Sequence, residues 1–302
     1  MRLGLALPQY GIFADPKAIV AVATRAEAEG FDSLWVGDRI LVPTHPSAQY
    51  PGGAVPPGFR RFLDPLTVLT VAAGVTEHAR LGTNTLNALW QPPLLLARTL
   101  TSLDHVSGGR LDVGLGLGWS PDEYEAVGVP WAGRGARLEE TVDIFEAAWT
   151  HDLTAHQGPL WTVPEGRIEV KPLQTPRPPI LFGGFAPAVL ERVGRRGDGW
   201  LAGPVPPGAL AAMWATVGAA AERHHRDPAA LRLVVRVNPS VERAPEDQVP
   251  RRGSVDQIAD YIAAIAPAGA TEVVFDLQQT ATDLDQLIDL SGQLKEAVNK
   301  RV

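Results

Sequence analysis

The feature that most constrains the fold of this chain is a regular recurrence of short apolar runs separated by longer segments with helical periodicity. The eight runs are residues 2–7, 32–37, 79–86, 110–118, 178–184, 198–203, 232–238 and 271–277. Apolar residues spaced by three and four predict helices between them, among others over 16–29, 137–149, 206–223 and 283–300. Strands that alternate with helices form parallel sheets through right-handed crossovers, and eight such strands close most simply into a barrel. We therefore predict an α/β protein, a single (β/α)8 or TIM barrel domain over residues 1–302.

Two long connections interrupt this alternation. Residues 40–65 follow the second strand and are rich in Pro and Gly, and their length indicates a functional loop over the mouth of the barrel. Residues 151–178 follow the fourth helix and predict an excursion with a small extended hairpin before the fifth strand. Neither segment predicts a second domain.

The composition argues against several classes of function. The chain has no cysteine, which rules out disulfides, thiolate catalysis and Cys-ligated metals, and its seven histidines lack the spacing of a common metal site, so we predict no metal. A formal net charge of −7 opposes nucleic-acid binding, which needs a basic surface. No apolar run reaches the length of a membrane span, and the first one is broken at Pro8, too early for a signal peptide. We expect a cytoplasmic protein.

A barrel of this kind carries its active site at the carboxyl ends of its strands. The residues predicted there are Gln9, Tyr10, Asp38, Arg39, Asn84–Asn87, Gly118, Trp119, Gly183–Phe185, Gly203, Pro204, Asn238 and Asp276–Gln278. The set has few acid–base pairs and is rich in glycine, amide and aromatic groups, which is typical of a surface that binds a flat cofactor. Such a cofactor would carry the chemistry.

Two glycine clusters each allow two interpretations. Gly183 and Gly184 end a strand and precede a helix, where free amides and the helix dipole favour a phosphate, but a tight turn also needs such a pair. Gly114, Gly116 and Gly118 alternate along one strand, with a spacing that differs from the dinucleotide fingerprint. They leave room for a planar ring in the mouth, or they merely fit the barrel interior.

Asp38 and Arg39 stand side by side at the end of the second strand. Because adjacent residues of a strand point to opposite sides, we expect only one of them to face the mouth. Arg39 keeps its proton, so its roles would be to anchor an anion or to stabilise negative charge on a reduced ring. A local salt bridge between the two residues is the simpler alternative.

Several aromatic residues fall in the predicted loops after strands, where they would form an apolar substrate wall if they converge. These residues are Tyr50, Phe59, Trp90, Trp119 and Trp131. Scattered exposed aromatics are the plain alternative.

Seven segments, in this order, span nearly the whole chain and resemble one family: GLALPQYG, AEAEGFDSLWVGDR, ARLGTNTL, PPLLLARTLTSLDHVSGGRLDVGLGLGWSPDEYEAVG, RLEETVDIFEAAW, PPILFGGFAPAVLERVGRRGDGW and GSVDQIADYIAAIAPAGATEVVFDL. They are similar to the bacterial-luciferase-like superfamily of flavin and deazaflavin oxidoreductases, and within it to the branch that depends on coenzyme F420. The resemblance implies a luciferase-like TIM barrel that binds its cofactor in the mouth, passes a hydride between cofactor and substrate, and forms a homodimer.

The resemblance also implies which residues line the cofactor: Asp38, Thr83, Asn84, Thr85, Gly116, Leu117, Gly118, Trp119, Gly183, Gly184 and Phe185. A cis peptide bond that is common behind the ring in this superfamily falls near Asn84–Thr85. Many relatives carry His where Arg39 stands, and the sugar-phosphate dehydrogenases of the branch carry Glu where Trp119 stands. These departures disfavour a dehydrogenase with a His base and a Glu acid. They favour a reductase that acts on an activated double bond, with protons from water or a nearby Tyr.

The leading hypothesis is thus an F420-dependent oxidoreductase acting on an apolar or conjugated small molecule. Its catalytic residues would be Arg39, Asp38 and Trp119, and its substrate would contact Tyr50, Trp90 and Trp131. One alternative is an FMN-dependent monooxygenase that uses O2 and a separate flavin reductase. The other is a non-catalytic protein that binds a flavin or deazaflavin.

Overall fold

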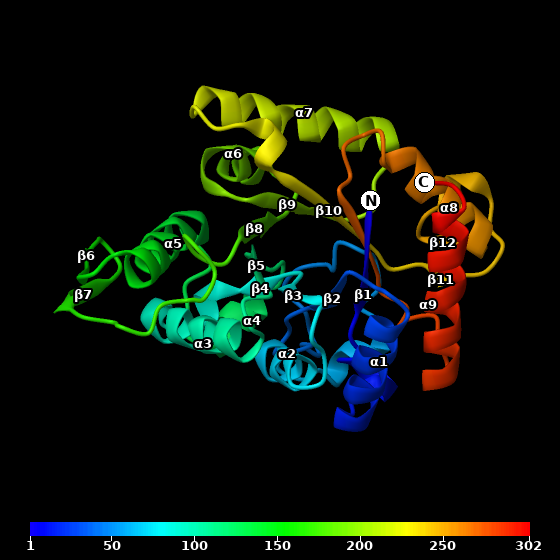
Figure 1. Ribbon diagram of the computed structural model, residues 1–302, viewed down its shortest axis with the longest axis horizontal. Helices are drawn as coiled ribbons and strands as arrows, with labels where there is room; N and C mark the ends of the chain where they lie inside the picture. The colour runs from blue at the N-terminus through cyan, green and yellow to red at the C-terminus, as the bar shows by residue number, and fades with distance from the viewer.

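Eight parallel strands form a closed barrel in the computed structural model, which describes residues 1–302 (Figure 1). They are β1 (Arg2–Ala6), β2 (Ser33–Val36), β3 (Arg80–Thr83), β5 (Leu111–Gly116), β8 (Ile180–Gly183), β9 (Gly199–Ala202), β10 (Arg232–Val237) and β13 (Glu272–Phe275). Their order around the barrel is β3, β2, β1, β13, β10, β9, β8 and β5, and pairing of β5 with β3 closes the ring. Each predicted apolar run supplies one strand, so the predicted TIM barrel is confirmed.

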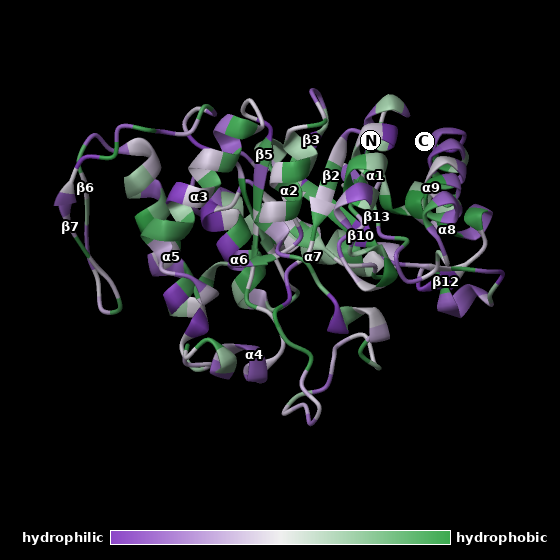
Figure 2. Cartoon of the chain, turned by 90° about the horizontal axis from the view of Figure 1, so that it is seen from below, coloured by the Kyte–Doolittle hydropathy of each residue, from purple (hydrophilic) through white to green (hydrophobic).

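One long helix follows each barrel strand and covers its outer face. These helices are α1 (Pro16–Ala28), α2 (Pro65–Ala73), α3 (Pro93–Val106), α5 (Arg134–Thr150), α6 (Pro187–Arg196), α7 (Pro207–Arg223), α8 (Val255–Ile265) and α9 (Leu284–Asn299). Proline opens α1, α2, α3, α6 and α7, because its missing N–H is not needed at the first helical position. The Asp15 carboxylate and a Ser254–Gln257 capping box satisfy the free amides of α1 and α8. Hydrophobic and hydrophilic residues are interspersed along the helices, as amphipathic packing requires (Figure 2).

Both predicted insertions are present. Residues 40–64 form no strand ladder or α-helix, and α2 begins at Pro65. They contain only the short 3-10 helix η2 (Pro57–Arg60) and two isolated bridges, one of them to Tyr10. Residues 151–178 contain the antiparallel hairpin β6 (Thr154–Gln157) and β7 (Thr162–Gly166), which lies beside α5, away from the barrel strands (Figure 1). The sequence did not predict a third insertion after β10, with β11 (Ser240–Val241), η5 (Glu246–Gln248) and β12 (Arg252–Gly253).

The remaining short elements lie between the barrel units. They are η1 (Gly11–Phe13), β4 (Leu86–Asn87), η3 (Ala88–Trp90), α4 (Pro121–Ala126) and η4 (Pro228–Ala230). β4 extends the sheet by pairing with β5, and α4 follows β5 on the mouth side of the barrel (Figure 2). None of the helices combines the length and the hydrophobicity that crossing a bilayer requires.

The interior of the barrel is filled by a buried cluster of Trp35, Leu181, Leu201, Val234 and Val274, and it is closed at one end by charges. Trp35 is fully buried, and its ring occupies the space that a Cβ on Gly82 would need. Below it, at the amino ends of the strands, the Trp35 Nε1 donates to Ser33 and to the buried carboxylate of Glu272. The packed interior leaves only the opposite end, the mouth, for a ligand.

Candidate active site

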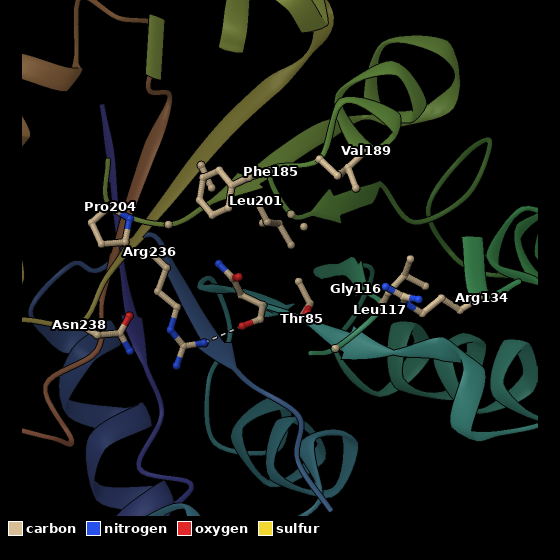
Figure 3. A pocket seen from close by; sticks show the side chains of 17 residues that line it. Thr85, Gly116, Leu117, Arg134, Phe185, Val189, Leu201, Pro204, Arg236 and Asn238 are labelled. Atoms are coloured by element: carbon tan, nitrogen blue, oxygen red, sulfur yellow. Dashed lines mark hydrogen bonds between the residues drawn. The ribbon is translucent and has the colours of Figure 1, made fainter. Parts of the chain in front are cut away.

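Two adjoining cavities, of about 410 and 640 Å³, lie at the carboxyl ends of the barrel strands. The smaller one, here called the glycine cavity, includes Gly116, Gly118, Gly183, Gly184 and Gly203 in its wall (Figure 3). The larger one, here called the aromatic cavity, is walled on one side by the loop 40–65. The residues shared by both walls are Asn84, Thr85, Gly118, Phe185, Gly203, Pro204, Arg236 and Asn238. The two cavities therefore form one continuous hollow of a size typical of ligand sites.

The glycines of the smaller cavity allow close approach of backbone and side chains. A Cβ on Gly116 or on Gly183 would overlap the Thr85 side chain, which fits between β5 and β8 only because both positions are glycine. Gly184 has φ +131°, a conformation that L side chains rarely adopt. The structure thus supports the turn and close-packing interpretations, and Gly116, Gly183 and Gly184 also line the cavity where the phosphate and ring are predicted.

The aromatic cavity is enclosed by a continuous group of rings. Tyr50 lies 5.3 Å from Trp119 and 5.8 Å from Phe59 between ring centroids, and Phe59 is 5.8 Å from Phe62. Trp90 lines the same cavity. The convergence expected of Tyr50, Phe59, Trp90 and Trp119 is therefore present.

Two residues expected at the site lie elsewhere. Trp131 lines neither cavity, because its ring packs 5.0 Å from Tyr124 and under the guanidinium of Arg134, 3.7 Å away. Thr83 is fully buried in the barrel wall, where its hydroxyl exchanges hydrogen bonds with the backbone of Gly114. Their assignments to substrate and cofactor are corrected accordingly.

Asp38 and Arg39 both line the aromatic cavity, so the expectation that only one would face the mouth is wrong. The chain leaves β2 after Val36, and the alternation of a strand no longer applies beyond that point. Arg39 forms its ion pair with Glu123 and not with the adjacent Asp38. The distance from Arg39 Nη2 to Glu123 Oε2 is 3.6 Å. Asp38 instead accepts the backbone N–H of Asn87 at 3.0 Å.

The acidic groups in this region are harder to ionise than usual. Desolvation raises the pKa of Asp38 to about 7, and the nearby carboxylates of Asp64 and Glu123 act in the same direction. Burial also raises the pKa of Glu123, which Arg39 only partly offsets. Burial raises the pKa of Tyr50, so its hydroxyl keeps its proton at neutral pH. Asp38 is therefore the group in the cavity that can hold or release a proton near neutrality.

A second polar cluster spans the boundary of the two cavities. Arg236 donates from Nη1 to the carbonyl of Asn84 at 2.7 Å (Figure 3) and from Nη2 to Asp276. Asp276 also accepts from Asn238 at 2.8 Å and from the Tyr10 hydroxyl. Burial tends to lower the pKa of Arg236, but Asp276 outweighs it and raises that pKa. This cluster fixes a permanent positive charge beside Asn84.

The sequence interpretation missed Arg236 and Glu123 and underestimated the charged pairs at the mouth. Arg236 lies within a strand whose neighbours Val235 and Val237 are buried, and a charge inside such a strand was the available signal. Glu123 lies on α4, a short helix that the sequence did not predict. Asp276 was among the strand-end residues but received no role.

Six buried nitrogen donors around the hollow have no hydrogen-bond partner within the protein. They are Arg39 Nη1, Asn84 Nδ2, Asn87 Nδ2, Trp90 Nε1, Arg134 Nε and Arg236 Nε. An unpaired buried donor costs about 1–3 kcal/mol, and all six belong to side chains that line the hollow, so a ligand with several acceptors would be stabilised here once these side chains turn toward it. Arg134 and Arg236 lie on opposite sides of the glycine cavity (Figure 3). The ring carbonyls and phosphate of a flavin or deazaflavin have the matching chemistry, so the residues fit such a group.

The Asn84–Thr85 peptide bond is cis, which confirms its predicted position. The sequence profile described as luciferase-like monooxygenase matches residues 2–292. The chain belongs to this family. No three His, Asp or Glu side chains lie together as a ligand set for a metal.

Three proteins illustrate the range of this luciferase-like family. An uncharacterized protein of Mycobacterium tuberculosis (strain ATCC 25618 / H37Rv) is 30% identical over 280 residues, which cover 87% of this chain and 88% of that protein. The F420-dependent glucose-6-phosphate dehydrogenase of Amycolatopsis mediterranei is 28% identical over 190 residues, 62% of this chain and 53% of the dehydrogenase. The crystal structure of the monooxygenase RslO1 from Streptomyces bottropensis superposes with a TM-score of 0.82, 20% identity and 99% coverage of both chains. The family thus includes F420-dependent dehydrogenases and monooxygenases on one fold. Membership of this family supports the prediction that the chain is an oxidoreductase.

Proposed function

We propose that this luciferase-like protein is an F420-dependent oxidoreductase, which transfers a hydride between the deazaflavin and an apolar or conjugated small molecule. The observation that supports this proposal most is the set of unpartnered donors around the hollow. The donors occur in both compartments, whereas all aromatic rings of the walls except Phe185 belong to the larger compartment alone. That division suits a polar, phosphate-bearing cofactor next to an apolar substrate.

The glycine cavity would hold the cofactor. Gly183, Gly184 and Phe185 precede α6, and their amides with Arg134 would bind the phosphate. Asn84, Thr85 and Arg236 stand where the two cavities meet and would contact the ring. The cofactor-lining residues Gly116, Leu117 and Gly118 complete the wall. When bound, the deazaflavin supplies or accepts the hydride.

The aromatic cavity would hold the substrate. Tyr50, Trp90 and Trp119 exclude water from it, and Arg39 stabilises negative charge that develops on the substrate. Asp38, with a pKa of about 7, gives or takes the proton that accompanies the hydride. The chain's own residues thus position the substrate, keep it dry and manage one proton.

A second candidate function is an FMN-dependent monooxygenase, favoured by the description of the family as luciferase-like monooxygenases. FMN offers similar ring acceptors and one phosphate, so the same donors suit it. The proposal extends to a homodimer in the cytoplasm and to a separate flavin or F420 reductase that regenerates the reduced cofactor.

The test is a titration of the purified protein with F420 and, separately, with FMN, following quenching of the fluorescence of its eight Trp residues, of which Trp90 and Trp119 line the hollow. Tight binding of F420 with weak binding of FMN is expected. A preference for FMN, together with oxygen consumption in the presence of reduced FMN, would support the monooxygenase instead. Binding of neither cofactor would remove the functional proposal and leave the barrel.

A further inference from the structure

Arg39 stands out among the charged side chains of the aromatic cavity because its binding capacity is unused. It is 8% exposed, and its Nη1 donor is buried without a partner. Its guanidinium lies 4.7 Å from the ring centroid of Trp119 and 5.2 Å from that of Phe59, contacts that leave its donors free. The carboxylate of Glu123 is 3.6 Å away, beyond a good hydrogen bond. The Arg39 side chain lines the aromatic cavity, so this buried guanidinium offers hydrogen-bonding capacity to an acceptor bound there.

The charges around the cavity indicate what kind of acceptor fits. Its wall holds three carboxyl groups and three guanidinium groups: Asp38, Glu123, Asp276, Arg39, Arg236 and Arg251. Arg236 is paired with Asp276, and Arg39 faces Glu123, so no buried cation is left over to neutralise a bound carboxylate. An anion would also approach Asp38 and raise its pKa further. A neutral oxygen acceptor avoids both costs.

The walls indicate the shape of the rest of the ligand. Tyr50, Phe59, Phe62, Trp90 and Trp119 present ring faces and edges around a volume of about 640 Å³. Flat conjugated molecules gain offset-stacked and edge-to-face contacts with such rings.

We propose that the aromatic cavity binds an uncharged, planar α,β-unsaturated carbonyl compound, whose carbonyl oxygen accepts a hydrogen bond from Arg39. The proposal rests on the proposed function, which supplies reduced deazaflavin as the two-electron donor. The β carbon of the substrate takes the hydride, and the C=C electron pair moves onto the carbonyl oxygen. The enolate so formed is stabilised by Arg39, and its α carbon takes one proton from Asp38, which is reprotonated from solvent. The products are the saturated carbonyl compound and oxidised cofactor.

Docking of the carbonyl can be measured without turnover. The absorption band of 4-(dimethylamino)cinnamaldehyde moves to longer wavelength when its carbonyl oxygen accepts a hydrogen bond from a cation. We expect this shift when the compound binds the purified protein, both without added cofactor and with oxidised F420. The Arg39→Met variant should still bind the compound, as quenching of tryptophan fluorescence would show, but its absorption band should not shift. The Arg39→Lys variant should retain part of the shift. Arg60→Met is the matched control, because Arg60 is exposed on η2 and lines neither cavity. Wild-type binding without a shift, or a full shift in Arg39→Met, would overturn the proposal.

Turnover separates this proposal from the proposed function. With reduced F420, the enone 4-phenylbut-3-en-2-one should be reduced with a kcat/KM about 10²-fold above that of cinnamate, and Arg39→Met should lose about 10²-fold on the enone. A preference for cinnamate would contradict an uncharged substrate. A spectral shift with no turnover would contradict the proposed function and support the carbonyl site. Enone reduction that is unchanged in Arg39→Met would support the proposed function and contradict the carbonyl site.

Discussion

The two ends of the barrel both bury charge, but they treat it differently. At the amino end, the fully buried carboxylate of Asp112 lies between Arg80 at 2.6 Å and Arg232 at 2.9 Å. Glu272, also fully buried, pairs with Arg2 and Arg232, both at 3.1 Å. At the mouth Arg236 is closely paired with Asp276, but the nearest ion-pair distance of Arg39 is 3.6 Å, and six donors have no partner.

This difference separates charged groups that hold the fold together from charged groups that remain available to a ligand. A network that satisfies nearly all of its own members has nothing to offer a ligand, and at the amino end only Arg232 Nε lacks a partner. Donors left unpaired at the mouth each cost the folded protein free energy unless a ligand satisfies them. Matched substitutions at the two ends of the barrel test this distinction.

The largest effect is expected from removing a charge at the amino end. Glu272→Gln leaves Arg2 and Arg232 short of an anion in a buried site, so the free energy of unfolding should fall by about 3–5 kcal/mol. Glu123→Gln is the matched change at the mouth. Burial raises the pKa of that carboxyl, so its charge stabilises the folded protein less, and we expect a loss of about 1–2 kcal/mol from weaker bonds to Arg39 and to the amides of Ile40 and Leu41. Urea denaturation of both variants measures the difference. Equal losses at the two ends would contradict the distinction.

The second effect is a pH dependence that originates at the mouth. Because the pKa of Asp38 is about 7 in the folded protein and near 3.8 otherwise, the folded state holds a proton that the unfolded state has lost between these values. The stability of the protein should therefore fall as pH rises from about 4 to about 7, by at most about 4 kcal/mol from this group. Asp38→Asn should remove that part of the decline in urea denaturation at pH 5 and pH 8. An unchanged decline in the variant would show that Asp38 ionises normally.

The barrel could be predicted from the sequence because its cause is local. Runs such as 178–184 and 198–203 have almost no charged residues on either face, a pattern typical of buried parallel strands. The third insertion was missed because its strands β11 and β12 have two residues each and carry no periodicity.

The site was only partly predictable, because its geometry depends on contacts distant in sequence. Asp38 and the glycines lie at strand ends, where barrel geometry alone places them near the mouth. Trp131 follows β5 just as Trp119 does, yet the packing of Tyr124 and Arg134 turns it away. The partner of Arg39 lies on α4, and no spacing rule could connect two residues so far apart.

A smaller effect, mainly on binding, is expected at Arg134. Its side chain lines the glycine cavity, so Arg134→Gln should weaken F420 binding about 10- to 100-fold, since a hydrogen bond to a charged group contributes about 1.5–3 kcal/mol. The free energy of unfolding should fall by about 0.5–1 kcal/mol as well, because the guanidinium also stacks on the Trp131 ring. Arg98→Gln, an exposed arginine of α3, is the control for the loss of one positive charge. Equal weakening in both variants, followed by fluorescence titration, would assign the effect to net charge rather than to the cavity.

The smallest effect is expected from Trp119→Phe, which keeps a ring under Arg39 but weakens the cation–π contact. Phenylalanine attracts a cation less strongly than tryptophan, and the difference is about 0.5–1 kcal/mol for a contact of this kind. The wavelength shift of bound 4-(dimethylamino)cinnamaldehyde should decrease slightly, and its affinity should fall about three-fold. Cofactor affinity should stay unchanged, because Trp119 lines the aromatic cavity and not the glycine cavity. A loss of cofactor binding in this variant would mean that the glycine cavity and the aromatic cavity do not separate cofactor from substrate. The contrast between the two ends of the barrel would not be affected by that result.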